Sequence, residues 1–334
     1  MALGQYRLRS RRIEEPIREA PERVGSAASG VAVCRAPARC RGVPHARGRA
    51  TAESGFDQGR RQAVIRLIAA GAALNAKVSG AQPQSFAAIL AELSSDPDLT
   101  APMRRHDELD GSQPGLERAP VRSTKSSVTI SPEATELIIA CEVSSRAVYE
   151  KLYLAPVWPK GKSGLTIGIG YDIGYVDADE LKADWGQYLA IATIVRLSEA
   201  CRITGTAAAA LAESLSSVQV DWKIAKQQFD QEAKPRYVGM TRAALPQPEQ
   251  LNGSTLGALV SLVYNRGPSF SLAGDRYSEM RNIKEHLSSG DLGRVPNELR
   301  CMKRLWAGMP DMRGVVLRRE AEAKLFESGL AKKV

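Results

Sequence analysis

The sequence predicts an α+β fold that is mostly helical, with a small β-hairpin or sheet and an N-terminal third that is largely disordered. Three observations lead to this fold class. Residues 164–174 read GLTIGIGYDIG, in which apolar side chains alternate with small or polar ones, as in a strand. Segments on both sides of this stretch repeat apolar residues at helical spacing. Residues 1–60 have hardly any apolar periodicity.

Charge is unevenly distributed along the 334 residues. The net charge is +9, and the first 50 residues hold eleven arginines, no lysine and four glutamates, which is +7. The rest of the chain is close to balanced and need not bind polyanions, so we expect no nucleic-acid partner. No uncharged apolar run reaches about 18 residues, so we expect no transmembrane segment.

Cysteine and histidine show no pattern of a metal or redox site. The cysteines are Cys34, Cys40, Cys141, Cys201 and Cys301, and the histidines are His45, His106 and His286. No C-x-x-C pair occurs, and no histidine has a partner at metal-ligand spacing. We therefore expect no metal, no cofactor, no disulfide framework and no histidine-based catalysis.

Residues 1–60 cannot bury enough apolar surface to offset the entropy of ordering, so we interpret them as a disordered Arg-rich segment or the product of a start codon placed too early. An arm that binds nucleic acid or a membrane surface is the alternative. Residues 61–127 are predicted to hold short helices and a linker, with Phe86, Ile89 and Leu93 on one helix face. The apolar stretch 63–74 resembles a secretory signal only faintly, because Arg66 interrupts it far inside the chain.

The compact domain is predicted to span residues 128–334. Ser131 is a suitable N-cap and Pro132 a suitable first residue for a helix that ends with Glu142. A carboxyl group at a helix C-terminus faces the negative end of the dipole. That position and partial burial would both favour the protonated form that a general acid needs, whereas the alternative is a solvated glutamate.

An aromatic, turn-rich loop is predicted over 149–159, where Trp158 is placed to line a sugar-sized groove. Two nucleotide-binding motifs fail nearby. The phosphate-binding loop that would end at Ser163 requires a glycine where Pro156 stands. The dinucleotide fingerprint that would start at Gly168 requires a glycine where Ile173 stands.

In the 164–174 stretch, Ile167 and Ile169 would face a core, while Thr166 and Asp172 would share the other face with two glycines. On a straight strand Thr166 and Asp172 would lie roughly 20 Å apart. They can share one site only if the chain bends at Gly168 and Gly170, where a bend costs little. A tight hairpin without chemistry is the alternative.

The remainder is predicted to be helical. Helices are expected over 177–189, 191–214 and 222–231, over the apolar stretch that contains Leu256, Leu259, Val260 and Val263, and over 313–328. The fourth helix should end at Asn265-Arg266-Gly267-Pro268. In the last helix Leu317, Ala321 and Leu325 share a face, and Glu320 pairs with Lys324.

Residues 131–330 resemble the phage-type lysozymes of glycoside hydrolase family 24, and more closely their pesticin-like relatives. The matching features, in order, are Glu142 at a helix end, TIGIGYD at 166–172, ALVSLVYNRG at 258–267 and RGVVLRREAEAKLF at 313–326. The resemblance implies a lysozyme-like fold that cleaves the β-1,4 bond between N-acetylmuramic acid and N-acetylglucosamine in bacterial peptidoglycan. It also implies that no metal or cofactor is required.

Carried over position by position, Glu142 matches the general acid, Thr166 the threonine that helps to place the water, and Asp172 the second carboxylate of the pesticin-like branch. One departure is that residues 143–165 contain no aspartate, where phage lysozymes usually have one. Four residues are candidates for contacts in the substrate groove: Trp158, Tyr171, Asn265 and Arg266. We expect Arg313, Arg318 and Arg319 to hold the last helix in place.

The implied reaction inverts the anomeric centre, which requires the two carboxyl groups to be about 6.5–9.5 Å apart, whereas retention requires about 5–5.5 Å. A lytic transglycosylase and a non-catalytic peptidoglycan-binding module are the alternatives. We expect a monomer that is made in a bacterial or phage-infected cytoplasm and acts on the periplasmic cell wall. An endolysin, a secreted toxin and a secreted effector would share this domain.

Overall fold

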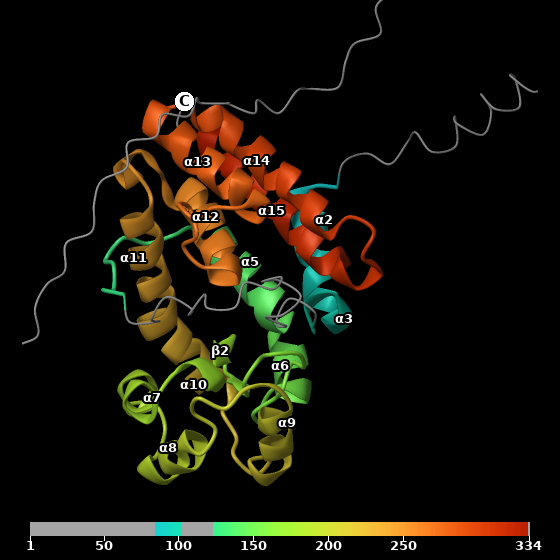
Figure 1. The fold of residues 1–334 in the computed structure, drawn as a ribbon, viewed down its shortest axis with the longest axis vertical. Coiled ribbons are helices and arrows are strands. Elements are labelled where there is room, and N and C mark those ends of the chain that lie inside the picture. The colour runs from blue at the N-terminus through green and yellow to red at the C-terminus, as the bar shows by residue number, and fades with distance from the viewer. Residues whose placement is uncertain (1–83, 102–122, 333–334) are drawn as a thin grey trace, which may run out of the picture. The chain divides into compact units, whose positions relative to one another are not determined.

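The computed structural model describes residues 84–101 and 123–332, all within one compact unit of residues 75–334 (Figure 1). The predictions for residues 1–60 and for a helix over 63–74 lie outside the described residues. Within the described ranges the chain is mostly helical, with one antiparallel sheet of two short strands. The α+β fold class is therefore confirmed in its coarse form.

The elements up to residue 198 are α2 (Phe86–Ser95), α3 (Pro97–Thr100), α5 (Pro132–Val143), α6 (Arg146–Leu152), β1 (Thr166–Ile167), β2 (Tyr171–Asp172), the 3-10 helix η2 (Ile173–Tyr175), α7 (Ala178–Trp185) and α8 (Ile191–Ser198). The later ones are α9 (Gly205–Ser214), α10 (Trp222–Gln228), the π-helix η3 (Phe229–Ala233), α11 (Lys234–Ala244), α12 (Gly253–Arg266), α13 (Ser278–Ser289), α14 (Val295–Cys301) and α15 (Arg313–Ala331). Short 3-10 turns at 248–250, 275–277, 292–294, 302–306 and 310–312 join the last helices.

Helix α5 begins as its sequence predicts. The Ser131 hydroxyl accepts a hydrogen bond from the Ala134 N–H at 3.2 Å, and Pro132 occupies the first turn. The helix ends at Val143, so Glu142 lies in its last turn as expected. The predicted loop over 149–159 is wrong in its first part, because α6 starts at Arg146, where Ser145 supplies a second N-cap.

The glycine-marked stretch is a hairpin and not one continuous strand. Gly168 and Gly170 have φ of +55° and +78°, a region that glycine adopts without a steric penalty. The chain therefore turns between β1 and β2, and Thr166 pairs directly with Asp172. The bend that these two residues need in order to share a site is present.

Two predicted helices differ in length from expectation. The helix predicted over 191–214 is divided into α8 and α9. The break at 199–204 contains Arg202 and is followed by Gly205, the first residue of α9, and both residues have positive φ. The helix predicted over 222–231 continues through η3 into α11. A π-helical turn inserts one extra residue per turn and often lies at a functional site.

Helix α12 is the centre of the core and is in contact with α5, α11 and α15. Nearly all of its residues are buried, including the predicted stripe from Leu256 to Val263. It ends at Gly267, whose φ is +71°, as the Gly-Pro signal predicts. A Cβ atom on Gly257 would lie 2.2 Å from the Ala134 Cβ, so the α12 backbone packs directly against the Ala134 side chain of α5.

Helices α2 and α3 pack against α5 and α15, so they are part of the same compact unit (Figure 1). The predicted helix with Phe86, Ile89 and Leu93 on one face is confirmed as α2, whose Ile89 and Leu93 are fully buried. This unit begins before residue 128, where the sequence analysis placed the start of the compact domain.

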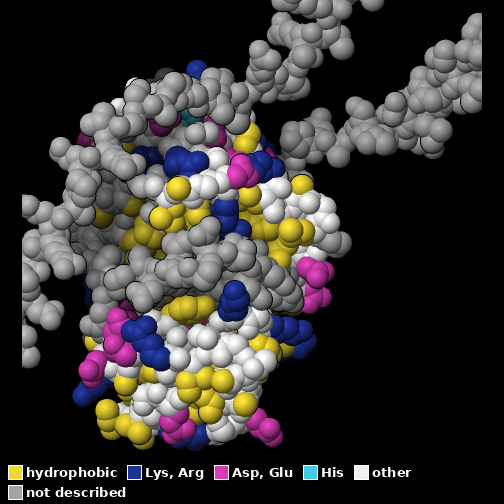
Figure 2. Space-filling view, viewed as in Figure 1, with side chains coloured by type: hydrophobic (Ala, Val, Ile, Leu, Met, Phe, Trp, Pro, Cys, Tyr) yellow, Lys and Arg dark blue, Asp and Glu magenta, His cyan; other side chains and the backbone are white. Residues whose placement is uncertain are grey.

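The surface of the described residues mixes both signs of charge. In Figure 2, lysine and arginine side chains lie among aspartate and glutamate side chains over the lower part of the face shown. In the last helix the predicted pair is present, with Lys324 Nζ 3.6 Å from Glu320 Oε1. Every helix of the described ranges is too short or too polar to cross a membrane.

Candidate active site

Glu142 lies where α5, the hairpin and α15 meet. Its residue is 7% exposed, so the carboxyl group is nearly buried. Arg318 of α15 places Nη1 2.9 Å from Glu142 Oε1. A carboxyl group in such a position is not the solvated glutamate of the alternative interpretation.

Arg318 is fixed by a buried network. It is fully buried and donates through Nη2 to the Ser261 carbonyl oxygen at 2.8 Å. Its Nε lies 3.3 Å from Glu322 Oε1, which also accepts from the Ser261 hydroxyl at 2.7 Å. Because each guanidinium nitrogen has a partner, the direction from which Arg318 approaches Glu142 is set.

Burial and nearby charged groups shift the pKa values of Arg318 and of the adjacent Cys141. Burial alone would lower the pKa of Arg318, but Cys141, Glu142 and Glu322 around it raise that pKa above its ordinary value. Burial raises the pKa of the Cys141 thiol to about 12, so this cysteine is a neutral core residue near pH 7. Arg318 is therefore a permanent cation next to Glu142.

The hairpin reaches Glu142 through Gly170. A Cβ atom on Gly170 would lie 2.8 Å from Glu142 Oε2, closer than any side chain could be accommodated without movement. Tyr264 of α12 donates its hydroxyl to the Ile169 carbonyl oxygen at 2.6 Å and holds the hairpin tip in place. Of the glycine face predicted from sequence, Gly170 lies against the carboxyl group, whereas Gly168 lies against Trp185.

Thr166 and Asp172 are opposite each other at the base of the hairpin, and both are nearly buried. The main chain of Thr166 pairs with Val157, with N–O distances of 2.8 and 3.0 Å. Asp172 accepts the Gly174 N–H on Oδ1 at 2.9 Å and the Gly164 N–H on Oδ2 at 3.2 Å. Asp172 therefore closes the hairpin and caps η2, in addition to any chemical role.

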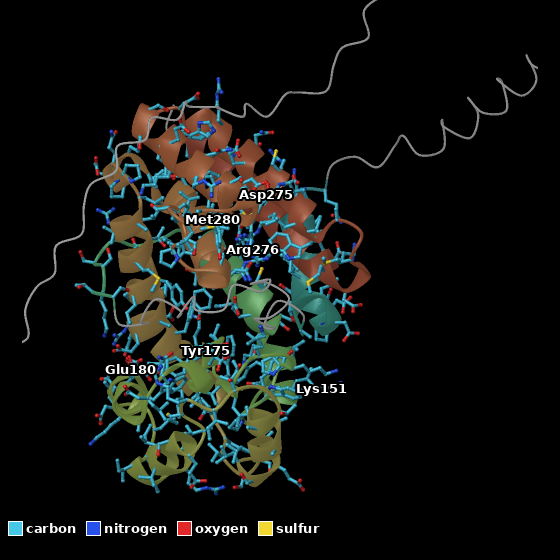
Figure 3. All side chains as sticks on the ribbon, in the orientation of Figure 1. Lys151, Tyr175, Glu180, Asp275, Arg276 and Met280 are labelled. Atoms are coloured by element: carbon cyan, nitrogen blue, oxygen red, sulfur yellow. The ribbon has the colours of Figure 1, made fainter. Side chains whose placement is uncertain are left out.

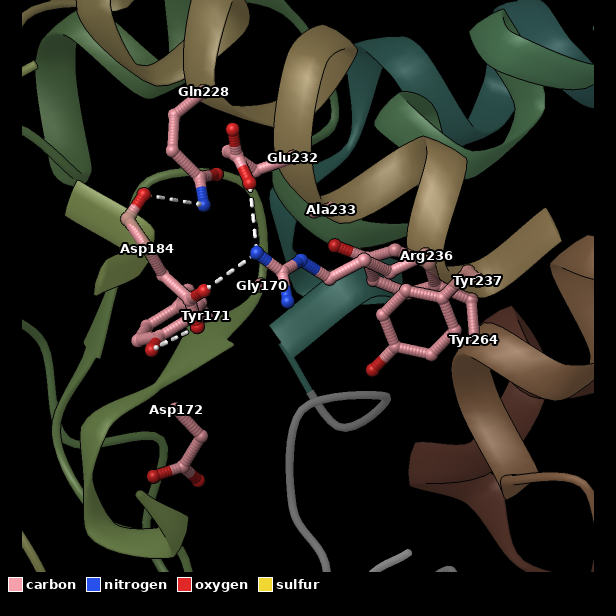
Figure 4. A pocket seen from close by; sticks show the side chains of 10 residues that line it. All are labelled: Gly170, Tyr171, Asp172, Asp184, Gln228, Glu232, Ala233, Arg236, Tyr237 and Tyr264. Atoms are coloured by element: carbon pink, nitrogen blue, oxygen red, sulfur yellow. Dashed lines mark hydrogen bonds and ion pairs between the residues drawn. The ribbon is translucent and has the colours of Figure 1, made fainter. Parts of the chain in front are cut away.

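Tyr171 belongs to β2 of the hairpin, and its ring packs on the ring of Trp185 with a centroid distance of 5.6 Å. Its hydroxyl donates to Asp184 Oδ2 at 3.0 Å. Arg236 Nη2 lies 3.0 Å from Asp184 Oδ1 and 2.8 Å from Glu232 Oε2, so one guanidinium joins two buried carboxylates (Figure 4). Burial and the nearby Asp184 charge raise the pKa of Tyr171, which keeps it a hydrogen-bond donor.

A small cavity of about 20 Å³ lies inside this cluster, which is enough for one water molecule. Gly170, Asp172 and Tyr264 also line it, so it extends from the buried cluster to the hairpin (Figure 4). Tyr237 stacks on Tyr264 with a centroid distance of 4.1 Å and completes the aromatic side. Asp172 and Tyr171 line this cavity, and Glu142 does not.

Trp158 is half-buried and packs on the core, and its indole N–H donates to the Ser163 carbonyl oxygen at 3.1 Å. The Tyr175 hydroxyl, from the residue labelled in Figure 3, donates to the Lys162 carbonyl oxygen at 3.1 Å. The two aromatic side chains therefore hold the loop before β1. In this position Trp158 fixes the loop that leads to Thr166.

Asn265 and Arg266 end α12 and contact the C-terminal helices. Asn265 Oδ1 accepts from Arg319 Nη2 at 3.2 Å, and Arg319 also reaches Glu322 at 2.8 Å. Arg266 donates to the carbonyl oxygen of Arg276, a residue labelled in Figure 3, at 2.8 Å and lies 5.5 Å from the Trp306 ring centroid. Among the described residues, Arg319, Glu322 and Arg318 connect Asn265 to Glu142.

A larger groove of about 640 Å³ lies away from the hairpin, between residues 126–130, α5 and the η3–α11 segment. Thr135 and Ile139 line it, whereas Glu142, one turn further along α5, lines neither of these two cavities. Among the described residues, no three His, Cys, Asp or Glu are placed to hold a metal ion.

The ion pair of Glu142 with Arg318 was not predicted from the sequence. The sequence analysis assigned Arg318 to holding the last helix in place. It also did not find the buried cluster of Asp184, Glu232 and Arg236. Glu232 and Arg236 are spaced as an i, i+4 pair on a helix. This spacing could have predicted their ion pair from the sequence.

The three segments that carry the family resemblance all lie around Glu142. TIGIGYD supplies Gly170, ALVSLVYNRG supplies Ser261 and Tyr264, and the last segment supplies Arg318. The lysozyme-like fold and the peptidoglycan reaction remain predictions that rest on these segments. A comparison of the chain with protein-family models and with curated proteins gives no match.

Proposed function

We propose that this protein is a peptidoglycan hydrolase that cleaves the β-1,4 bond between N-acetylmuramic acid and N-acetylglucosamine, with Glu142 as its general acid. One observation supports this proposal above the others. Two of the segments chosen from sequence for their resemblance to lysozymes reach the same nearly buried carboxyl group, through Gly170 and Arg318. The third contacts those two, through Tyr264 and Ser261.

In this proposal Glu142 acts as the general acid on a glycoside. The leaving oxygen of a glycosidic bond needs a proton as the C–O bond breaks, and Glu142 would donate it. Arg318 holds Oε1, so the orientation of the carboxyl group is fixed before substrate binds. Asp172, opposite Thr166 on the hairpin, would accept a proton from the attacking water, and the Thr166 hydroxyl would help to place that water.

A lytic transglycosylase is the second candidate, and the hydrogen bonds of Asp172 favour it. Both oxygens of Asp172 accept main-chain N–H groups, and residues 143–165 offer no aspartate. A transglycosylase needs one acid. The C6 hydroxyl of the muramoyl residue attacks its own C1, the C1–O bond to the next sugar breaks, and Glu142 returns a proton to the leaving oxygen and takes one from the hydroxyl. The product is a 1,6-anhydro sugar and no water is consumed.

Release of sugar ends from purified peptidoglycan tests the proposal. The full chain is compared with Glu142→Gln, which keeps the size of the side chain and removes its acid. Glu136→Gln is the matched control, because Glu136 is exposed on the same helix. We expect Glu142→Gln to lower product release at least about 100-fold and the control to leave it unchanged within about twofold.

Mass spectrometry of the products separates the two candidate reactions. Reducing N-acetylmuramic ends indicate hydrolysis, and 1,6-anhydro ends indicate a transglycosylase. The Asp172→Asn variant also distinguishes the two reactions, because it should abolish hydrolysis and leave transglycosylation largely intact. If a folded wild-type chain releases neither product but sediments with peptidoglycan, the protein is a binding module and the hydrolase proposal is wrong.

A further inference from the structure

Helices α2 and α3 contact both helices that carry the Glu142–Arg318 pair. On the α15 side, Glu92 forms an ion pair with Arg313. The Leu99 carbonyl oxygen also approaches Gly314 so closely that a Cβ there would lie 1.7 Å from it. Only glycine can occupy position 314 with α3 in this place.

On the α5 side, one buried hydrogen bond joins the two segments. Thr100 Oγ1 lies 2.9 Å from Ser144 Oγ, and both residues are almost fully buried, at 0% and 2% exposure. The Thr100 hydroxyl donates its one proton to the Pro97 carbonyl oxygen at 3.0 Å. Either hydroxyl can donate across this contact, and when Thr100 gives its single proton to Pro97 the Ser144 hydroxyl donates to Thr100.

Ser144 has a backbone conformation that is rare for its residue type. Its φ is +60° and ψ is −72°, and it is the residue at which α5 stops, two positions after Glu142. A non-glycine residue in such a region costs about 1–3 kcal/mol and persists only where its surroundings hold it. The Ser144 N–H bonds to the Ala140 carbonyl oxygen at 3.1 Å, and its hydroxyl bonds to Thr100.

We propose that residues 84–101 brace the catalytic helix, and that Thr100 and Ser144 are positioning residues for Glu142. This inference rests on the proposed function of Glu142. Thr100 holds the Ser144 hydroxyl, Ser144 keeps its strained turn, and the turn fixes the last residues of α5 toward the hairpin. The brace also contacts α15 at Gly314, four residues before Arg318. The same segment therefore supports both helices of the Glu142–Arg318 ion pair.

The brace lies N-terminal to the part of the chain that resembles lysozymes, residues 131–330. A fragment that starts at residue 128 would retain Glu142, Thr166 and Asp172 but would lose Thr100 and its bond to Ser144. We therefore expect catalytic competence to require a segment that the resemblance does not include.

The test uses the full chain with Thr100→Val, which keeps the shape of the side chain and removes the acceptor for Ser144. Thr100→Ser, which restores the hydroxyl, is the rescue variant. Ser95→Ala is the matched control, because Ser95 is exposed on α2 and bonds only within its own helix. We expect Thr100→Val to lower kcat for peptidoglycan cleavage about 10-fold or more with KM within about twofold, since displaced catalytic groups lose transition-state contacts and keep substrate binding.

A second measurement does not depend on activity. In hydrogen–deuterium exchange, we expect the amides of residues 140–146 to exchange faster in Thr100→Val than in wild type, while Thr100→Ser and Ser95→Ala match wild type. Unchanged exchange in Thr100→Val overturns the brace, whatever the activity of the wild-type chain.

The two proposals fail in different ways. If Glu142→Gln retains wild-type activity, the assignment of Glu142 as the general acid is wrong, and the exchange data still decide whether Thr100 orders the end of α5. If Glu142→Gln is inactive while Thr100→Val keeps the wild-type kcat, the catalytic role of the brace is wrong and the hydrolase proposal stands.

Discussion

Arg318 Nη1 lies 2.9 Å from Glu142 Oε1, although 176 positions separate the two residues in the chain. Both groups are removed from solvent, and Ser261 and Glu322 fix the guanidinium from its other sides. A buried ion pair of this kind loses more when one partner is removed than it contributes as a pair, because the remaining charge is left without compensation.

Arg318→Met should therefore destabilise the fold by about 3–5 kcal/mol, since it leaves Glu142 buried without its cation. Arg318→Lys keeps the charge and loses the fork that reaches three partners, so we expect it to fold and to lose at least about 10-fold in activity. Urea unfolding and sugar-end release measure the two effects. Arg313→Lys on the same helix is the control, and equal losses in it and in Arg318→Lys would contradict the prediction.

Gly170→Ala should impair the site more than a comparable change elsewhere. The new methyl group would meet Glu142 Oε2 at 2.8 Å, and the residue would also carry the strain of a φ of +78°. Gly290→Ala has nearly the same φ, +75°, and nothing within 4 Å of its Cβ, so it isolates the strain alone. We expect both to lose about 1 kcal/mol in thermal unfolding and only Gly170→Ala to lose activity. Activity that is equal in the two variants would show that Glu142 tolerates the methyl group.

Asp172 has a measurable structural role that is separate from its chemical one. Asp172→Ala removes the acceptors for the Gly164 and Gly174 N–H groups and should cost about 1–2 kcal/mol in urea unfolding. Asp172→Asn keeps one acceptor oxygen and should cost less than the alanine variant. Asp221→Ala, which removes the N-cap of α10 away from the hairpin, gives the scale for an ordinary cap. If Asp172→Asn is as unstable as Asp172→Ala, the amide cannot replace the carboxylate in the hairpin.

Glu232 should make folding dependent on pH. Burial alone would raise the pKa of Glu232, but hydrogen bonds from Lys125 and Arg236 lower it below its ordinary value. A carboxyl group with a lower pKa in the folded chain than in the unfolded chain stabilises the fold above about pH 4.3 and loses that contribution as the pH falls through the folded-state pKa. Glu232→Gln should thus be less stable than wild type at pH 7.

This difference should shrink when urea unfolding is repeated near pH 3.5. Glu213→Gln on α9 is the control, because Glu213 is exposed. A difference between wild type and Glu232→Gln that stays constant between the two pH values would show that the ion pair with Arg236 adds nothing to stability.

Local signals predicted the fold well where they were strong. Ser131 with Pro132, and Gly267 with Pro268, mark the ends of α5 and α12, because caps and breakers act over a few residues. The break between α8 and α9 was not predicted, since Ala-rich residues 205–214 continue the helical pattern after a turn that only Arg202 and Gly205 mark.

Long-range contacts could not be predicted in the same way. Nothing near Arg318 in sequence distinguishes it from Arg319, and only the packing of α15 decides which of them reaches Glu142. The position of Thr100 beside Ser144 likewise depends on how α3 packs against α5, which leaves no periodic trace in the sequence.

The contact between Gly257 and Ala134 bears on how a polymer would enter the proposed site. The Ala134 methyl group lies directly against the Gly257 backbone, so α5 and α12 are closely packed and we expect them to move together, with Glu142 on α5. We then expect any opening to occur on the hairpin side. The Tyr264 hydroxyl bond to the Ile169 carbonyl oxygen joins α12 to the hairpin, and under the proposed function we expect this bond to break first when a glycan strand binds.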